Sequence, residues 1–145
     1  PPQENYIDAN EVTELLTMLW EGSTLSRESS DHIIDLMKGQ PVNTKYGAVI
    51  PGEHLANKTG ELGDVSHDSG YILLDGREVA LATTTAFTDI PRSEANVFVQ
   101  RSATIVYELL HEPLPAACLK RALSEGQLGS PAVPHGSPRN RQESR

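Results

Sequence analysis

The sequence predicts an α+β fold, in which antiparallel sheet strands are covered by flanking helices. Two amphipathic helical segments come first, three strand-like segments joined by turns follow, and a longer helical segment comes last. Strands joined by short turns pair antiparallel, and helices with one apolar face need a surface to pack on. At 145 residues, the chain has the length of one domain with a real core.

Charge is unevenly distributed along the chain. Residues 1–112 hold seven Lys and Arg against eighteen Asp and Glu, whereas residues 113–145 hold five against two. An acidic body argues against a nucleic-acid surface, which needs clustered basic and aromatic residues, and is typical of a solvated surface. No apolar run has the length that spans a membrane. We therefore expect no nucleic-acid partner and no membrane span.

Cysteine usage and the first residue limit the chemistry further. Cys118 is the single cysteine, so no internal disulfide is expected, and we interpret it as a passive thiol. The sequence offers no set of metal ligands, and we expect neither a metal nor another cofactor. The chain opens on Pro1 and shows no signal peptide, which indicates a processed, trimmed or cut product of a longer parent.

The first helix is predicted over residues 9–21. Asp8 and Glu11 have the spacing of a capping box, and Gly22 supplies a stop. Its apolar face is formed by Val12, Leu15, Leu16 and Leu19.

A second helix is predicted over about residues 27–38. Ser26 is its expected cap and Gly39 its stop. Its buried stripe consists of Ile33, Ile34 and Met37. His32, which sits beside this stripe, is expected to be a surface or hydrogen-bonded histidine.

Three antiparallel strands are predicted after a Gly- and Pro-rich loop over residues 39–53. A turn at Glu61–Ser66 joins the first strand to the second, and Asp75-Gly76 is a hairpin signal between the second and the third. The expected strands cover residues 54–60, Tyr71–Leu74 and Glu78–Phe87.

The last helix is predicted to start at a Ser93 cap and to run to about His111. Its apolar face is expected to consist of Phe98, Ile105 and Leu109, widened by Val106 and Leu110. Residues 113–145 are rich in Gly, Ser, Pro, Arg and Gln, and we expect a disordered basic tail.

A Lys58-Thr59-Gly60 tripeptide on the first predicted strand combines a cation and a hydroxyl, and its context makes it informative. The stretch Asn57-Lys-Thr-Gly-Glu-Leu-Gly-Asp-Val-Ser-His-Asp-Ser-Gly70 resembles the C-terminal part of class A serine β-lactamases and their penicillin-binding relatives. The following Tyr71-Ile-Leu-Leu-Asp-Gly76 and the earlier Asn5-Tyr6 fit the same pattern. The resemblance spans roughly residues 5–111, which is less than half of a complete family member.

The resemblance implies roles for five residues. Lys58 would hold the substrate carboxylate and tune proton transfer near the nucleophile, and Thr59 would donate its hydroxyl to the same carboxylate. Gly60 would leave room for substrate along the strand, and the backbone N–H of Glu61 would be one of two oxyanion-hole donors. His67 falls where many members carry a carboxylate-binding arginine.

Two of these positions leave alternatives open. His67 is expected either to bind the substrate anion or to form a structural pair with Asp68 that closes the turn. Glu61 departs from the small or hydroxyl residue expected there, and its carboxylate is unfavourable beside an anion pocket unless it points away. Ser66, His67 and Asp68 are adjacent, so their alternating directions on a strand exclude a catalytic triad among them.

The family's nucleophile motif is missing from this sequence. No lysine has a serine three positions before it, no asparagine has a serine two positions before it, and no Ω-loop glutamate is recognisable. A hydroxyl without an adjacent base is not a nucleophile, so the chain alone should not turn over a β-lactam.

The resemblance therefore implies a C-terminal part of a serine β-lactamase-like hydrolase. Its substrate would be a β-lactam or a D-alanyl peptide, and it would act with a complementary N-terminal segment or by self-association. A secreted or periplasmic location is implied, with any signal upstream of Pro1. The alternatives are a DD-peptidase-like acyl transferase and a non-catalytic or degenerate binding module that keeps the fold.

Overall fold

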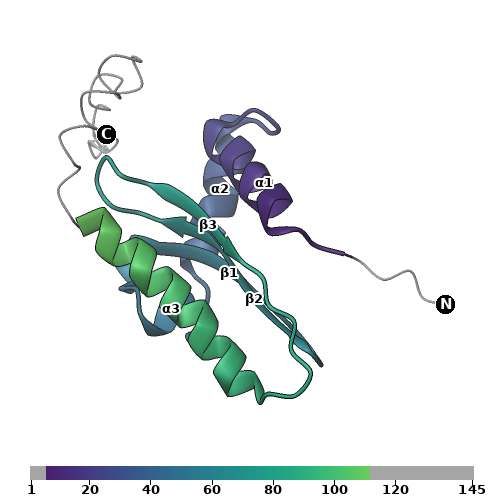
Figure 1. Ribbon diagram of the computed structural model, residues 1–145. Helices are drawn as coiled ribbons and strands as arrows, with labels where there is room; N and C mark the ends of the chain where they lie inside the picture. Colours follow the sequence, from purple (N-terminus) through teal and green to yellow (C-terminus); the bar gives the residue numbers. More distant parts are fainter. Residues whose placement is uncertain (1–5, 112–145) are drawn as a thin grey trace, which may run out of the picture. The chain divides into compact units, whose positions relative to one another are not determined.

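The computed structural model describes residues 6–111. In chain order the elements are α1 (Ala9–Glu21), α2 (Arg27–Lys38), the 3₁₀ turns η1 (Tyr46–Ala48) and η2 (Gly52–His54), β1 (Leu55–Leu62), β2 (Val65–Ile72), β3 (Val79–Thr83) and α3 (Arg92–His111). The strands form one antiparallel sheet in the order β1-β2-β3, with α3 on one face and α1 and α2 on the other (Figure 1). The predicted α+β fold is confirmed. The predicted tail at 113–145, with Cys118, lies outside the described residues.

The first two helices begin and end where the sequence indicates. Asp8 accepts hydrogen bonds from the backbone N–H groups of Asn10 (2.7 Å) and Glu11 (3.4 Å), which satisfies donors that the first helical turn leaves unpaired. Gly22 ends α1 in the left-handed conformation with φ of 69°, where a residue without Cβ is favoured. Ser26 caps α2 through the N–H of Ser29 at 3.2 Å.

One side of the sheet packs against α1 and α2. The core on this side consists of Leu16, Leu19, Ile34, Ala56 and Tyr71. The Trp20 and Tyr71 rings lie 5.3 Å apart, and the Tyr71 hydroxyl donates to the Leu16 carbonyl at 2.7 Å. Burial raises the pKa of Tyr71 to about 12. Leu15, expected on the buried face, is 60% exposed, because the contact with the sheet falls on Leu16 and Leu19 instead.

The predicted turn at Glu61–Ser66 is wrong, because β1 and β2 continue into it. Leu62 pairs with Val65, so only Gly63 and Asp64 connect the two strands. The second strand begins six residues before the predicted Tyr71 and ends at Ile72. Its polar first half hides the apolar pattern on which the prediction depended.

The predicted return strand Glu78–Phe87 is also shorter in the structure. Paired β3 covers Val79–Thr83, and an isolated bridge joins Val65 to Ala86 further on. The turn before β3 contains Gly76 with φ of 73°, which agrees with the predicted hairpin.

Helix α3 buries a different face from the one predicted. The buried residues are Ala95, Val99 and Ala103, and Val106 and Leu110 pack partly against the core as expected. Phe98, Ile105 and Leu109 are 59%, 58% and 64% exposed, so the prediction of that face is wrong. Small side chains on the buried face let the helix lie close to the sheet.

The start of α3 differs slightly from the prediction as well. The helix begins at Arg92, so Ser93 lies in its first turn rather than at the cap. No helix in residues 6–111 combines the length and the apolar character that crossing a bilayer requires.

Candidate functional site

The Lys58-Thr59-Gly60 tripeptide lies on β1, an edge strand of the described sheet. Its cross-strand partners on β2 are Ser69, Asp68 and His67 in that order. The Lys58 side chain is exposed, and its Nζ donates to the carbonyl of Thr59. A cation and a hydroxyl-bearing residue therefore sit side by side on an accessible strand.

The register of the hairpin fixes the direction of the Glu61 amide. The Leu73 N–H donates to the His54 carbonyl at 2.8 Å, so this pair is hydrogen-bonded across the strands. Bonded and non-bonded pairs alternate along an antiparallel ladder, which makes Glu61 and Ser66 a non-bonded pair. The hydrogen bond of the Ser66 N–H is consistent with this assignment. This N–H points away from β1 and donates to the Thr85 carbonyl at 3.3 Å.

The backbone N–H of Glu61 is therefore directed to the outer edge of β1. The same alternation directs the N–H and carbonyl of Thr59 to that edge. Within residues 6–111 no strand pairs with this edge. Such an edge can receive an extended substrate or a carbonyl oxygen in place of a neighbouring strand.

The Glu61 side chain points to the α3 face, away from Lys58. Its Oε1 accepts from Lys45 Nζ at 2.7 Å, and its Oε2 accepts from Arg92 Nη1 at 3.1 Å. The hydrogen bond from Lys45 is the main cause that lowers the pKa of Glu61, and both cations add to the effect. The carboxylate is thus charge-paired on the face opposite the motif cation.

His67 lies opposite Gly60 and is held as a hydrogen-bond acceptor on one side of its ring. The Thr85 N–H donates to His67 Nδ1 at 3.1 Å, which leaves Nε2 as the protonated nitrogen of the neutral ring. The alternative of a His67–Asp68 pair is wrong for this structure, because Asp68 points to the other face of the sheet. Substrate-anion binding by His67 stays a prediction.

Asp68 is fully buried in a polar layer under α3. It accepts from Asn57 Nδ2 at 2.9 and 3.0 Å and from the Tyr46 N–H at 3.0 Å. Burial raises the pKa of Asp68 above its ordinary value, against the opposing effect of these hydrogen bonds. The carboxylate fastens the segment before β1 to both strands of the hairpin.

A hollow of about 980 Å³ opens beside the end of this hairpin. Gly60, Glu61 and His67 are among the residues that line it, whereas Lys58 and Thr59 are not. The other lining residues are Tyr6, Ile7, Leu62, Asp64, Val65, Thr84, Thr85 and Ala86. The structure brings together three of the five predicted residues around one space, with the cation and hydroxyl on the strand leading into it.

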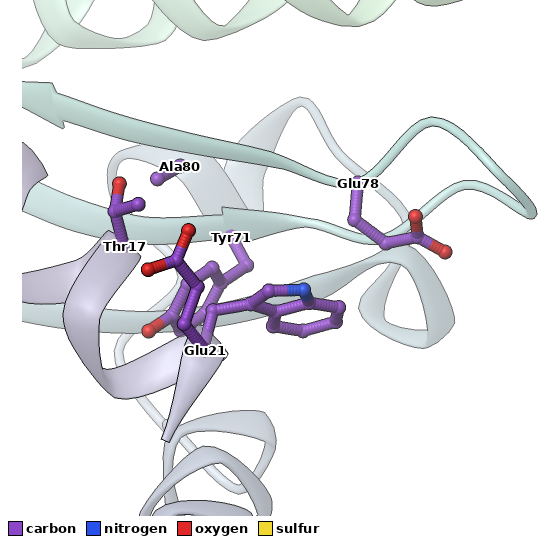
Figure 2. A pocket seen from close by; sticks show the side chains of 6 residues that line it. Thr17, Glu21, Tyr71, Glu78 and Ala80 are labelled. Atoms are coloured by element: carbon purple, nitrogen blue, oxygen red, sulfur yellow. The ribbon is translucent and has the colours of Figure 1, made fainter. Parts of the chain in front are cut away.

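A second hollow, of about 130 Å³, contains none of the predicted residues (Figure 2). It lies where α1 meets β2 and β3, and its lining consists of Thr17, Trp20, Glu21, Tyr71, Glu78 and Ala80. Figure 2 shows the Glu78 carboxylate lying away from Tyr71. Residues 6–111 contain no group of three His, Cys, Asp or Glu side chains arranged to hold a metal ion.

Sequence reasoning missed Lys45 and Arg92 as residues of the site. Lys45 lies in a segment predicted to be a loop, yet its side chain is fully buried. Arg92 precedes the predicted helix cap and contacts the hairpin from α3. A lysine next to the largely apolar Tyr-Gly-Ala-Val-Ile run is the only local signal for the first, and the second has none.

Solved structures with the same fold are β-lactamases and a related protein. The chain resembles TLA-1 extended-spectrum β-lactamase (18% identity, TM-score 0.69), covering 74% of this chain and 43% of that one. The β-lactamase from Sphaerobacter thermophilus is 24% identical with a TM-score of 0.64, and the match covers 78% of this chain and 44% of that one. PBP-A, a mutant of which was solved as an acyl-enzyme complex with penicillin G, has 24% identity and a TM-score of 0.58, with 69% and 38% covered.

These likenesses define the fold as that of a β-lactamase, of which the chain spans less than half. The chain belongs to the Beta-lactamase enzyme family, whose sequence profile matches residues 1–110. No curated protein matches the chain significantly.

Proposed function

We propose that this chain is the C-terminal part of a serine β-lactamase-like hydrolase that opens β-lactams through an acyl-serine intermediate. Lys58 and Thr59 bind the substrate carboxylate, and the Glu61 N–H forms part of the oxyanion hole. The nucleophilic serine and its base come from a complementary N-terminal part. The observation that supports this proposal best is the direction of the Glu61 N–H. Glu61 follows the motif directly, and its N–H points to the outer edge of β1, which no strand in residues 6–111 pairs with.

The placement of charged side chains around the outer edge of β1 supports the proposal. An oxyanion hole needs fixed N–H donors where the negative charge develops, and a cation nearby favours an anionic substrate. Lys58 is exposed on β1, while the Glu61 carboxylate is paired with Lys45 and Arg92 on the other face. The Glu61 carboxylate thus lies on the face opposite the Lys58 ammonium, on the same face as the Thr59 side chain, where the two cations neutralise it.

The exposed apolar surface supports the need for a complementary part. Within residues 6–111, the outer edges of β1 and β3 are unpaired. Phe98, Ile105 and Leu109 form an exposed apolar stripe on α3. Unpaired edges and exposed apolar faces favour association with another polypeptide segment.

Intact-mass measurement after incubation of the native preparation with penicillin tests the proposal. We expect a second polypeptide, or an N-terminal part of the parent, to gain the mass of penicillin while this chain does not. An adduct on this chain would contradict the proposal, because it would reveal a nucleophile within the 145 residues.

Lys58→Ala tests the assignment of the motif in the assembled enzyme. Loss of the cation is expected to slow acylation by roughly 10²-fold, the size of effect seen when one charge-stabilising group is removed from an active site. Lys38→Ala on α2 is the matched control, since Lys38 forms an exposed ion pair with Asp35 at 2.8 Å. Equal acylation rates for Lys58→Ala and the wild type would show that Lys58 has no role in acylation.

A non-catalytic or degenerate module is the second candidate, favoured by the missing Ser-x-x-Lys motif. It predicts a monomeric chain that unfolds cooperatively by itself and shows no penicillin adduct on any partner. Transfer of the acyl group to an amine, rather than to water, would identify the DD-peptidase-like acyl transferase instead.

A further inference from the structure

The Glu61 carboxylate is held by two cations that come from different parts of the chain. Lys45 reaches it from the segment before β1, and Arg92 reaches it from the first residue of α3. Each carboxylate oxygen has its own partner, at 2.7 and 3.1 Å. The position directly after the Lys-Thr-Gly tripeptide is therefore tied to two neighbouring elements through its side chain.

Arg92 also binds the backbone beyond Glu61. Its Nη2 donates to the carbonyls of Leu62 at 2.6 Å and Gly63 at 3.3 Å. Three acceptors in consecutive residues thus converge on one guanidinium, whose planar donors suit several fixed acceptors at once. The end of β1 is held at both its side chain and its backbone.

Burial makes the Lys45 contact costly to lose. The Lys45 side chain is 0% exposed, and its ammonium donates to Glu61 Oε1. The Glu61 side chain is 35% exposed, so the pair is only partly buried, but loss of the carboxylate would leave the enclosed Lys45 ammonium without its ionic partner, which costs more than losing an exposed pair. Any position of Glu61 that breaks this contact is therefore strongly disfavoured.

The outer edge of β1 has no neighbouring strand in residues 6–111 that would hold the Glu61 N–H directly. No strand of the described sheet pairs there, so the Glu61 N–H is not fixed by a ladder hydrogen bond. An oxyanion donor must hold its position within roughly 0.5 Å to be effective. The bonded Gly60–His67 pair of the ladder holds the carbonyl side of the same peptide group, and the contacts of Lys45 and Arg92 with residues 61–63 add restraints at the end of the strand, where the ladder stops.

We infer that Lys45 and Arg92 are positioning residues, which hold the Glu61 carboxylate on the α3 face so that the Glu61 N–H stays aimed at the substrate carbonyl. The inference rests on the proposed function, because it assigns that N–H to the oxyanion hole. It adds two residues far from the motif in sequence, neither of which touches substrate.

Acylation kinetics of the assembled enzyme with penicillin test the inference. Arg92→Gln is expected to lower the limiting acylation rate by about 10- to 100-fold with little change in the dissociation constant of penicillin, because a misplaced donor weakens transition-state binding alone. Arg92→Lys keeps the charge but not the three contacts, and is expected to recover only part of the rate. Lys45→Met should act in the same direction.

A readout on the full chain separates positioning from folding. In ¹H–¹⁵N spectra, the heteronuclear NOE of the Glu61 amide is expected to fall in Arg92→Gln and Lys45→Met. It should stay unchanged in the control Lys38→Met, which breaks the exposed pair with Asp35. Arg92 is 40% exposed, so its variant remains informative if Lys45→Met fails to fold.

The outcomes distinguish the inference from the proposed function. A wild-type assembly that forms no acyl-enzyme overturns both. A wild-type assembly that acylates, with Arg92→Gln at the wild-type rate and with an unchanged Glu61 NOE, overturns the positioning role alone. A change in the dissociation constant without a change in the limiting rate also overturns it.

Discussion

Asp68 is a buried carboxyl group in the middle strand of the sheet, and its protonation affects the stability of the fold. Its buried carboxylate accepts three hydrogen bonds from Asn57 and Tyr46. Burial nevertheless raises the pKa of Asp68 above 3.8, so the folded state binds this proton more tightly than the unfolded chain does. The stability gained from this tighter proton binding is fully present below the unfolded-state pKa of Asp68, and it is lost as the pH rises through the folded-state pKa.

Asp68→Asn should therefore change the pH dependence of unfolding. The free energy of unfolding of the variant, relative to the wild type, is expected to rise as the pH increases above the unfolded-state pKa of Asp68, because the variant has no buried charge to form. A pH-independent loss of about 1–3 kcal/mol is expected in addition, since an amide donor faces the donors of Asn57 and Tyr46. Urea unfolding at a series of pH values measures both. A pH-independent difference would contradict the raised pKa.

Single residues of a candidate site are recognisable in the sequence where a motif surrounds them, and the roles of these residues stay predictions. Lys58, Thr59 and Gly60 are recognisable because their chemistry is contiguous along one strand. Lys45 and Asp68 are not, since charged residues in a loop and in a polar run are expected to be exposed. Their burial depends on contacts between elements far apart in sequence.

At the level of elements, β1 and β2 lie so close together at Gly70 that a side chain would not fit between them. A Cβ added there would lie 2.1 Å from the Ala56 carbonyl oxygen and 2.6 Å from the Asn57 Cα. Both neighbours are backbone atoms, which cannot move without separating the strands. Only glycine is compatible with this pairing.

Gly70→Ala is expected to lower the free energy of unfolding by about 3 kcal/mol or more, because the clash overpacks the centre of the sheet. Gly52→Ala is the matched control, since a Cβ there meets no atom within 4 Å. The control should remain within about 0.5 kcal/mol of the wild type in urea titrations. Equal stabilities for the two variants would contradict the observed register.

Helix α3 presents apolar residues on two faces, and this is why its packing could not be predicted from periodicity. Phe98, Ile105 and Leu109 are larger than the buried residues of the helix, which are Ala95, Val99 and Ala103. Hydrophobicity alone selects the larger set. The structure instead buries the smaller side chains against the strands.

Val99→Ala should consequently destabilise the protein more than Phe98→Ala does. Val99 is 0% exposed, and its truncation leaves a cavity worth about 2 kcal/mol. Phe98 is 59% exposed, so its loss should cost less than about 1 kcal/mol in the chain alone. Thermal unfolding followed by circular dichroism ranks the two variants, and the reverse order would restore the face predicted from the sequence.

At the scale of the whole molecule, the exposed stripe on α3 and the outer edges of β1 and β3 are not covered by any segment of residues 6–111. The chain spans 38–45% of the length of the solved structures it resembles. We expect these surfaces to be where a complementary segment or a second copy associates.

Replacing Phe98, Ile105 and Leu109 together by Gln tests this expectation, because Gln keeps helix propensity while removing apolar area. The triple variant should sediment as a smaller species than the wild type at the same concentration, with an unchanged melting temperature. Leu36→Gln is the control, since Leu36 is 65% exposed on α2, at the other face of the sheet. Identical sedimentation of the triple variant and the wild type would contradict a role for this stripe.

The order of elements, the fold class and the family could all be predicted from the sequence. Caps, stops and a recognisable motif are local signals, and they place α1, α2 and β1 within a residue or two. The extent of β2 and the buried face of α3 depend on what the opposite strand or sheet supplies. That information is not contained in any one segment.

The buried ammonium of Lys45 also has a consequence for how this protein can change over generations. A substitution of Glu61 alone would leave that ammonium without its carboxylate, and a substitution of Lys45 alone would leave the carboxylate to Arg92. Each single step is unfavourable, whereas the paired replacement is not. Descendants of this sequence are therefore expected to alter positions 45 and 61 together, and a laboratory lineage selected for a new residue at one should acquire a compensating residue at the other.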